Sequence, residues 1–110
     1  MPGMNTAIQN KLEQVIVKEN SWLAKIAAAK LRSKRVAIVW GRSIHLCNTS
    51  KSEFLADEQW VKHELCHVQQ FRQYGTTRFV WLYLIESIRH GYYHNKFEVE
   101  ARAAENTGTL

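Results

Sequence analysis

Proline and glycine are scarce in this sequence of 110 residues: Pro2 is the only proline, and there are five glycines. No stretch is rich in proline, glycine or serine, and no segment repeats, so a flexible linker, a fibrous repeat and a solenoid are not expected. Hydrophobic residues make up 45% of the chain and charged residues 23%. That balance is typical of a globular protein, and the length suits a single domain.

Cysteines and long hydrophobic runs are also few. The two cysteines, Cys47 and Cys66, are not spaced as a CxxC pair. The longest apolar run, residues 79–85, is far shorter than the roughly 20 residues that a membrane-spanning helix needs. The N-terminus lacks the basic-then-apolar pattern of a secretory signal. We therefore expect free thiols in a reducing compartment, a cytoplasmic location and no transmembrane segment.

Basic residues outnumber acidic ones, 15 to 10, which gives a formal net charge of +5. Such a charge can attract nucleic acid, an anionic membrane surface or an acidic substrate. The basic residues are nonetheless spread along the chain, and aromatic residues do not alternate with them as in single-strand-binding proteins. We therefore expect a solvated basic surface and no specific binding of nucleic acid.

The N-terminal third has a helical pattern. Residues 1–4 are assigned to a tag remnant or a disordered end, and residues 5–32 to N-terminal helices with Ser21 as an N-cap between them. The apolar residues that recur at helical spacing are Ile8, Leu12, Val15, Ile16, Leu23, Ile26, Ala27 and Leu31.

Residues 35–47 are predicted to form strands. Val36–Trp40 is short and rich in β-branched residues, and Ile44–Cys47 alternates apolar and other side chains. Gly41 and Arg42 form a turn between them, so a short β-hairpin or small sheet is expected. Residues 48–51 have the composition of a loop.

Residues 57–105 are predicted to form a helical core. The three expected helices are Asp57–Tyr74, Arg78–His90 and residues 95–105. Asp57 and Thr77 are candidate N-caps, and Gly75 ends the first of these helices. The tryptophans are predicted to pack in the core or between helices; they are Trp22, Trp40, Trp60 and Trp81. Cys66 is predicted to be a buried, inert thiol and Gln70 an exposed polar residue.

The segment His63-Glu64-Leu65-Cys66-His67 has the HExxH spacing. Two histidines four residues apart lie on one face of a helix, one turn from each other, so their imidazoles can bind one metal ion. Glu64 lies beside the first histidine, where a carboxylate can act as a general base in metalloprotease chemistry. The sequence therefore predicts a metal site on this helix.

A catalytic zinc site needs a third protein ligand, for which the sequence downstream of the motif offers several candidates. Glu98 is preferred, and Glu100 is the alternative, because the two cannot share one helix face. His90 and His94 are rival ligands, since imidazole binds zinc well. Asn95-x-x-Glu98 also resembles a capping box, which would give Glu98 a structural role instead.

The segment His63 to Gln70 resembles the HELxHVxQ segment of small gluzincin-like zinc metallopeptidase domains. These include the minigluzincins and the domain associated with extracellular contractile injection systems. The resemblance implies that His63, His67 and a later glutamate on a second helix bind zinc. In the family pattern an aspartate follows that glutamate by four residues and orients a ligand histidine. By this spacing Glu98 is the ligand, and Arg102 stands in the aspartate position, where it cannot accept a hydrogen bond.

The resemblance also implies a mechanism. Zinc activates a water molecule, Glu64 acts as the general base, and a nearby donor stabilises the oxyanion. The candidate donors or substrate contacts precede the last helix; they are Tyr92, Tyr93 and His94, together with His90. In related peptidases an extended substrate pairs with an edge strand, and Ser43–Cys47 is the strand expected to fill that place.

The sequence thus predicts an α+β fold, a mainly helical zincin-like single domain with a short β-hairpin or small sheet. The predicted function is that of a zinc-dependent metallopeptidase acting on a peptide or protein substrate. The alternative is a zinc-binding interaction or scaffold domain with little or no catalysis.

Overall fold

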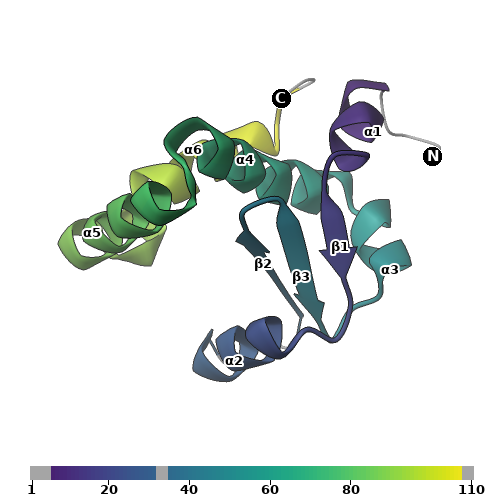
Figure 1. Ribbon diagram of the computed structural model, residues 1–110, viewed down its shortest axis with the longest axis horizontal. Coiled ribbons are helices and arrows are strands. Elements are labelled where there is room, and N and C mark those ends of the chain that lie inside the picture. Colours follow the sequence, from purple (N-terminus) through teal and green to yellow (C-terminus); the bar gives the residue numbers. More distant parts are fainter. Residues whose placement is uncertain (1–5, 32–34, 108–110) are drawn as a thin grey trace.

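Three short strands and six helices make up the part of the chain that the computed structural model describes, residues 6–31 and 35–107 (Figure 1). The helices are α1 (Thr6–Leu12), α2 (Trp22–Leu31), α3 (Lys51–Ala56), α4 (Glu58–Tyr74), α5 (Thr76–His94) and α6 (Lys96–Ala104). The strands are β1 (Ile16–Lys18), β2 (Val36–Trp40) and β3 (Ser43–Cys47). The predicted α+β class is confirmed, with one mainly helical domain and one small sheet. Residues 1–4, assigned above to a tag or a disordered end, lie outside the described residues.

The strands form one mixed sheet in the order β1-β3-β2. The predicted hairpin is confirmed: β2 and β3 pair antiparallel, with Val39 opposite Ile44, and Gly41 adopts the positive φ of +62° that the tight turn requires. The prediction that Ser43–Cys47 is an edge strand is wrong. β3 is the central strand because β1 pairs with its other side, so β2 is the edge on the side away from β1.

The strand β1 corrects the prediction that residues 5–32 are helical throughout. The helical spacing holds through α1, which ends at Leu12, but Ile16–Lys18 pairs in parallel with β3. Two of its three residues are β-branched, which favours a strand once a partner is available. Ser21 directly precedes α2 as predicted, although its hydroxyl bonds to the His45 ring at 2.8 Å.

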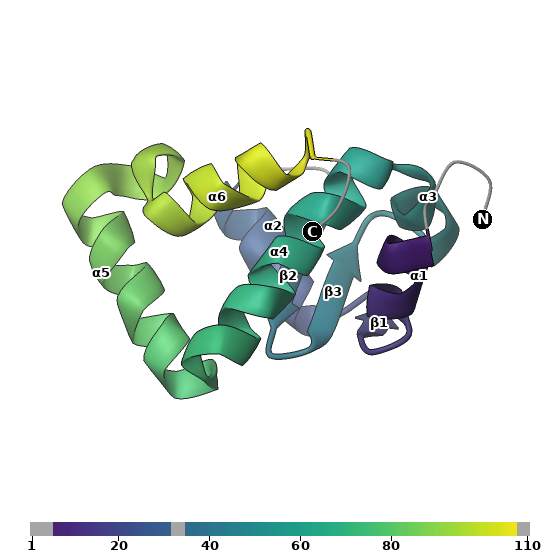
Figure 2. The same cartoon turned by 90° about the horizontal axis from the view of Figure 1, so that it is seen from above.

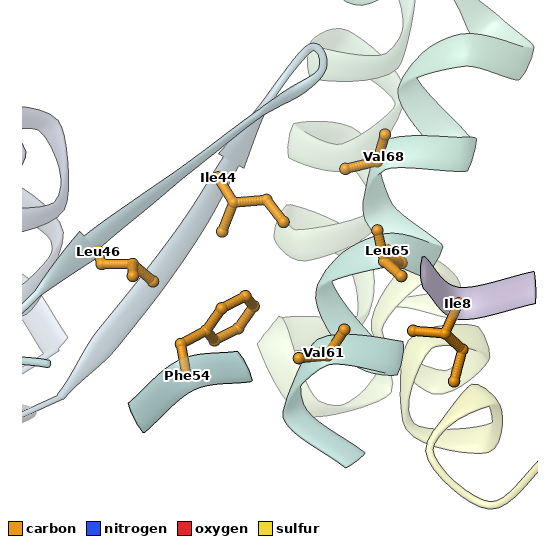
Figure 3. Close-up of a cluster of buried hydrophobic side chains, with 7 residues drawn as sticks. All are labelled: Ile8, Ile44, Leu46, Phe54, Val61, Leu65 and Val68. Atoms are coloured by element: carbon orange, nitrogen blue, oxygen red, sulfur yellow. The ribbon is translucent and has the colours of Figure 1, made fainter. Parts of the chain in front are cut away.

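Successive side chains of a strand point to opposite faces of the sheet, and the side chains on one face form the main core. Ile44 and Leu46 face α4, whereas Cys47 faces α2 together with Ala24 and Val36. Figure 3 shows the main cluster, in which side chains from α1, β3, α3 and α4 meet: Ile8, Ile44, Leu46, Phe54, Val61, Leu65 and Val68. The sheet therefore supports one side of α4 over much of its length.

The predicted limits of α4 are confirmed. The Asp57 carboxylate accepts a hydrogen bond from the Trp60 N–H at 3.1 Å, and Gly75 ends the helix with a φ of +83°. The short helix α3 was not predicted, because residues 48–51 were assigned to a loop. Its signal is a capping box, in which Ser50 and Glu53 bond to each other's backbone N–H.

The helices α4, α5 and α6 form a triangle, seen from above in Figure 2. α5 leads away from the end of α4, and α6 returns alongside α4. The corner is filled by Phe71, Phe79 and Phe97; the ring centroid of Phe79 lies 4.6 Å from that of Phe71 and 4.9 Å from that of Phe97. α5 begins at Thr76, one residue before the predicted cap Thr77, and extends to His94 across a kink at Gly91.

The prediction that the tryptophans pack in the core or between helices is wrong for Trp22 and Trp81, which expose 72% and 64% of their surface. Trp40 is 50% exposed, but its ring centroid lies 6.1 Å from that of the buried Phe71, and Trp60 packs on Phe54. Helical spacing alone does not say which face of a helix is covered. Among the described residues, no helix is long and apolar enough to cross a membrane.

Candidate metal centre

The two motif histidines lie on α4, on the side that faces α6. Residues four apart on a helix stand one above the other, and the rings of His63 and His67 are 5.1 Å apart between centroids. His67 is buried and His63 is partly buried. The opposite side of α4 is held by the sheet through Val61, Leu65 and Val68, so this packing fixes the direction of the motif.

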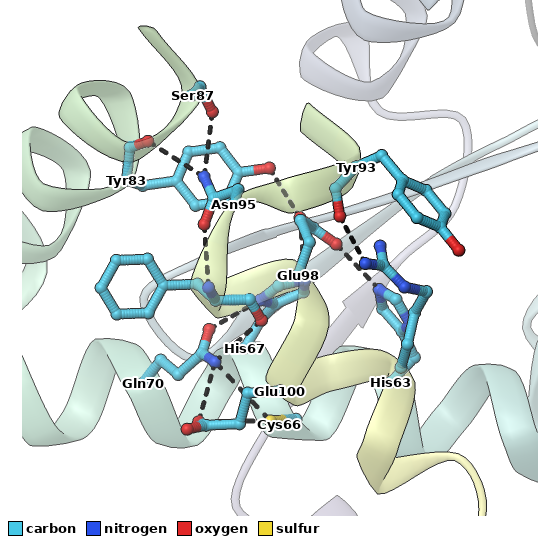
Figure 4. Close-up of polar contacts among 12 residues, drawn as sticks. His63, Cys66, His67, Gln70, Tyr83, Ser87, Tyr93, Asn95, Glu98 and Glu100 are labelled. Carbon is cyan, nitrogen blue, oxygen red and sulfur yellow. Dashed lines mark hydrogen bonds and ion pairs between the residues drawn. The ribbon is translucent and has the colours of Figure 1, made fainter. Parts of the chain in front are cut away.

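Glu98 on α6 meets both histidines. Its Oε1 lies 3.2 Å from Nε2 of His63, and its Oε2 lies 3.2 Å from Nε2 of His67 (Figure 4). The glutamate is only 3% exposed. One ligand atom from each of these three residues lies within 4.8 Å of the others, so the group could hold a metal ion. α6 comes this close because small side chains, Cys66, Ala101 and Ala104, form the contact between the helices.

The rival third ligands lie elsewhere. Glu100 is exposed and accepts a hydrogen bond from Gln70 at 3.0 Å, on another side of α6. His90 is exposed and lies beside Glu86, and His94 is exposed and contacts the Tyr93 ring. Glu98 is therefore the only one of the proposed third ligands that shares a site with His63 and His67.

Asn95 caps α6 and leaves the Glu98 side chain free for the site. The Asn95 Oδ1 accepts the Phe97 N–H at 2.8 Å, and its Nδ2 donates to Tyr83 O at 3.1 Å and to Ser87 Oγ at 2.9 Å. The alternative that Glu98 completes a capping box with Asn95 is therefore wrong, because the Glu98 carboxylate contacts the two histidines. Asn95 joins α5 to α6 and so determines where α6 begins.

Replacing Asn95 by alanine is expected to lower the free energy of unfolding by about 2 kcal/mol, because α6 loses its cap and two bonds to α5. Thermal unfolding of the metal-free protein measures the change. Asn106→Ala, at an exposed position after α6, is the control and should change stability by less than about 0.5 kcal/mol. Equal stabilities of the two variants would contradict the role given to Asn95.

Each histidine also has an acceptor for its other ring nitrogen. His63 Nδ1 donates to the Glu105 carboxylate at 2.7 Å, and His67 Nδ1 donates to the Gln70 side-chain oxygen at 2.8 Å. The Gln70 amide is oriented by Phe97 O, to which its Nε2 donates at 3.1 Å. Gln70 was predicted to be exposed, but it is only 1% exposed. Protonated Nδ1 atoms leave both Nε2 lone pairs for a metal ion.

Glu105 therefore does what the residue at position 102 was expected to do. Arg102 donates a hydrogen bond to Tyr93 O and lies over the Tyr93 ring at 4.0 Å. Glu105 follows Glu98 by seven residues, two helical turns, and so reaches the same side of α6. Sequence reasoning missed it because the family spacing pointed to position 102.

Tyr83 on α5 is a further site residue that sequence reasoning missed. Its hydroxyl donates to Glu98 Oε2 at 2.6 Å. Burial raises the pKa of Tyr83, and the adjacent Glu98 charge raises it further, so the phenol stays protonated. Its position in an apolar helical stretch gave no signal of this role.

The negative charge of Glu98 and the positive charges of His63 and His67 stabilise one another, as the directions of the pKa shifts indicate. Burial alone would lower the pKa of His63, but its bond to Glu98, the Glu64 charge and its bond to Glu105 raise it to about 9. Burial would raise the pKa of Glu98, yet its bonds to His63, His67 and Tyr83 hold it well below the usual range. A buried carboxylate between two imidazoles requires a cation, which a metal ion can supply in place of protons.

Glu64 lies in the wall of a pocket of about 400 Å³ that opens beside His63. The pocket is lined by Arg35, Val36, Ala37, Asp57, Gln59, Trp60, His63, Glu64, Tyr92 and Glu105. Burial raises the pKa of Glu64 to about 7, although the positive charges of His67 and His63 oppose the change. A carboxylate with such a pKa can both take up and release a proton near neutral pH.

The predicted oxyanion donors are separated by the structure. Tyr92 lines the pocket with Glu64, and burial together with the charges of Glu98 and Glu64 raises its pKa to about 12. Tyr93 and His94 do not line the pocket; Tyr93 contacts Arg102 instead.

No family model, curated protein or solved structure matches the chain. The interpretation of the site therefore depends on its own residues.

Proposed function

We propose that the chain is a zinc-dependent metallopeptidase. The observation that carries this proposal is the convergence of His63, His67 and Glu98 next to a pocket whose wall contains Glu64. Three protein ligands and an adjacent general base are the parts that a hydrolytic zinc site requires. Resemblance of the HExxH segment to gluzincin-like domains supports the same assignment.

Zinc is the metal that the donor set favours. Two imidazole nitrogens and one carboxylate oxygen form a mixed nitrogen and oxygen set, which suits zinc better than calcium or magnesium. The hydrogen bonds of Glu105 and Gln70 fix the ring orientation of each histidine. When bound, zinc would supply Lewis-acid chemistry, lowering the pKa of a water molecule and polarising a carbonyl group.

Glu64 is the proposed general base and acid. It accepts a proton from the attacking water and later gives it to the departing amine, so both transfers use one carboxylate. Its position among the residues that line the pocket supports this role, and its raised pKa suits a group that must do both. Tyr92 is the proposed donor to the oxyanion, since a pKa of about 12 keeps its hydroxyl protonated at neutral pH.

The edge strand β2 is the proposed guide for an extended substrate. Val36 and Ala37 line the pocket beside His63, and β2 is the edge of the sheet nearest the site. An edge strand has unpaired backbone groups that can pair with a peptide. The resemblance to gluzincin-like domains implies this role for Ser43–Cys47, but β3 is paired on both sides.

Zinc uptake tests the proposed site directly. Metal-free protein should bind about one equivalent of zinc, because the three ligands form one site. Metal analysis after purification and titration of the stripped protein would measure it. Binding of less than about a tenth of an equivalent would contradict the zinc proposal.

Replacing Glu105 by glutamine is expected to weaken zinc binding by about 10- to 100-fold, because His63 loses the charge that orients its ring. A competition titration against a chelator measures the zinc affinity. Arg102→Gln is the matched control on the same helix and should leave the affinity within about twofold, since Arg102 does not contact either histidine. A larger loss in the Arg102 variant would place the orienting role elsewhere.

A second candidate function is a zinc-binding interaction domain with little or no catalysis. Several large apolar side chains on α5 are exposed, as surfaces that bind partners often are. Both functions require the same metal ligands and therefore predict the same zinc uptake. They differ in whether Glu64 matters, and only a peptidase needs it.

A further inference from the structure

The outward side of α5 presents apolar side chains at helical spacing. Trp81, Leu84, Ile85 and Ile88 follow the i, i+3, i+4, i+7 pattern, and Ile88 is 85% exposed. We call these four residues, with Arg78 and Arg89, the outer face of α5. Both views place α5 at one end of the molecule, away from the sheet (Figures 1 and 2).

The fold does not require these side chains to be apolar. The inner side of α5 already supplies the packing of the helical triangle, through Phe79 and the partly buried Val80, Leu82 and Tyr83. The four apolar residues of the outer face expose between 46% and 85% of their surface. A contiguous apolar surface of this kind is typical of a binding site.

The charges on α5 identify what kind of partner suits the outer face. Arg78 and Arg89 are exposed, about 16 Å apart along the helix at the usual rise per residue. The only acidic residue of α5 is Glu86, whose side chain is 16% exposed and accepts the Lys96 N–H at 3.1 Å. The exposed surface of α5 is therefore apolar, aromatic and basic, with its one carboxylate largely covered.

We propose that the outer face of α5 binds the surface of an anionic lipid bilayer. Tryptophan, leucine and isoleucine are the side chains that enter the boundary between head groups and acyl chains, and arginines beside them bind lipid phosphates. The helix lies along the surface and does not cross it. The net charge of +5 adds a longer-range attraction to the same surface.

A second copy of the chain suits this face less well. Antiparallel pairing of two α5 helices brings Arg78 of one copy near Arg89 of the other, and parallel pairing brings like residues together. No well-exposed carboxylate on the described α5 residues offsets either repulsion. An anionic lipid surface neutralises both arginines at once. The inference does not depend on the proposed peptidase activity, because none of the six residues is a metal ligand or lines the pocket.

Vesicle co-sedimentation of the full chain tests the proposal. Vesicles of equal parts phosphatidylglycerol and phosphatidylcholine should bind the protein at low salt, and vesicles of phosphatidylcholine alone should bind it at least about tenfold more weakly. Ile85→Ser with Ile88→Ser should weaken binding to the anionic vesicles by at least about tenfold, because two large apolar side chains no longer enter the bilayer.

The matched control is Trp22→Ser with Ile26→Ser, which removes two exposed apolar side chains from α2. It should bind anionic vesicles as the wild type does. Circular dichroism and thermal unfolding of both double variants establish that they fold, as expected for exposed positions. Charge is tested by Arg78→Gln with Arg89→Gln, which should reduce the preference for anionic vesicles.

Three results would overturn the proposal. One is the absence of binding of wild-type protein to anionic vesicles at low salt. Another is an equal loss of binding in the α2 double variant, which would show that any exposed apolar pair suffices. The third is a dimer, found by light scattering, that the Ile85 and Ile88 changes convert to a monomer; the face would then be an interface between copies.

Discussion

Replacing Glu64 by glutamine is expected to lower kcat for peptide hydrolysis by about 10²- to 10⁴-fold, while zinc binding stays unchanged. Glutamine has nearly the same size and fills the same place in the pocket wall, but it cannot accept the proton of the attacking water. The Glu64 carboxylate is also not one of the three groups that converge as ligands. A loss of rate without a loss of metal is therefore the signature of a general base.

The experiment uses zinc-loaded protein and a diverse library of peptides, with cleavage followed by mass spectrometry. Glu58→Gln is the matched control, because Glu58 lies on the same helix, pairs with Lys62 and is not among the residues that line the pocket. It should retain wild-type activity. If the wild type cleaves nothing while binding zinc, or if the Glu64 variant cleaves as fast as the wild type, the peptidase proposal fails. In the first case the zinc-binding interaction domain becomes the better description.

Replacing Glu98 by glutamine is expected to weaken zinc binding by about 100-fold or more, because loss of an orienting residue alone costs about 10- to 100-fold. Glu98 bonds to both histidines and to Tyr83, so its charge is central to the site. The substitution keeps the shape of the side chain and should preserve the fold. Isothermal titration of stripped protein with zinc measures the affinity.

Glu100→Gln provides the control for this experiment, since Glu100 is two residues away on α6 and was the alternative ligand. It accepts a hydrogen bond from Gln70 and does not approach either histidine, so zinc affinity should change by no more than about threefold. If the Glu100 variant loses zinc and the Glu98 variant keeps it, the third ligand has been assigned to the wrong residue.

The parts of the fold that sequence predicted well are those set by local chemistry. The ends of α4 at Asp57 and Gly75 could be predicted because aspartate is a preferred N-cap and glycine is preferred where φ is positive. The HExxH spacing likewise places His63 and His67 together through helix geometry alone. These predictions needed no knowledge of which elements pack together.

The parts that sequence missed depend on contacts between distant segments. Ile16–Lys18 is a strand because β3 lies beside it, which no local pattern reveals. Trp81 was predicted to be a core or helix-packing residue but is exposed, because the spacing of apolar residues does not indicate which face of a helix remains uncovered.

The choice of Glu105 over position 102 shows the same limit within the site. Both positions lie on the side of α6 that carries Glu98, so periodicity could have suggested Glu105. An arginine cannot accept the His63 N–H, so Arg102 is excluded by its own chemistry and bonds to Tyr93 O, whereas the Glu105 carboxylate accepts from His63. The distance that lets Glu105 reach His63 depends on how α6 packs against α4.

The candidate ligands and their hydrogen-bond partners come from residues 63–105, whereas Arg35 and the first two residues of β2, Val36 and Ala37, form a separate stretch of pocket wall. Under the proposed peptidase function, the metal ligands and part of the substrate-contacting wall thus come from separate segments of the chain. Under the same proposal, variation at the three wall positions is expected to alter which peptide side chain fits, because none of the three is a candidate metal ligand. A combinatorial library at these positions, scored first for zinc retention and then for substrate preference, offers a route to redesigning such a small domain.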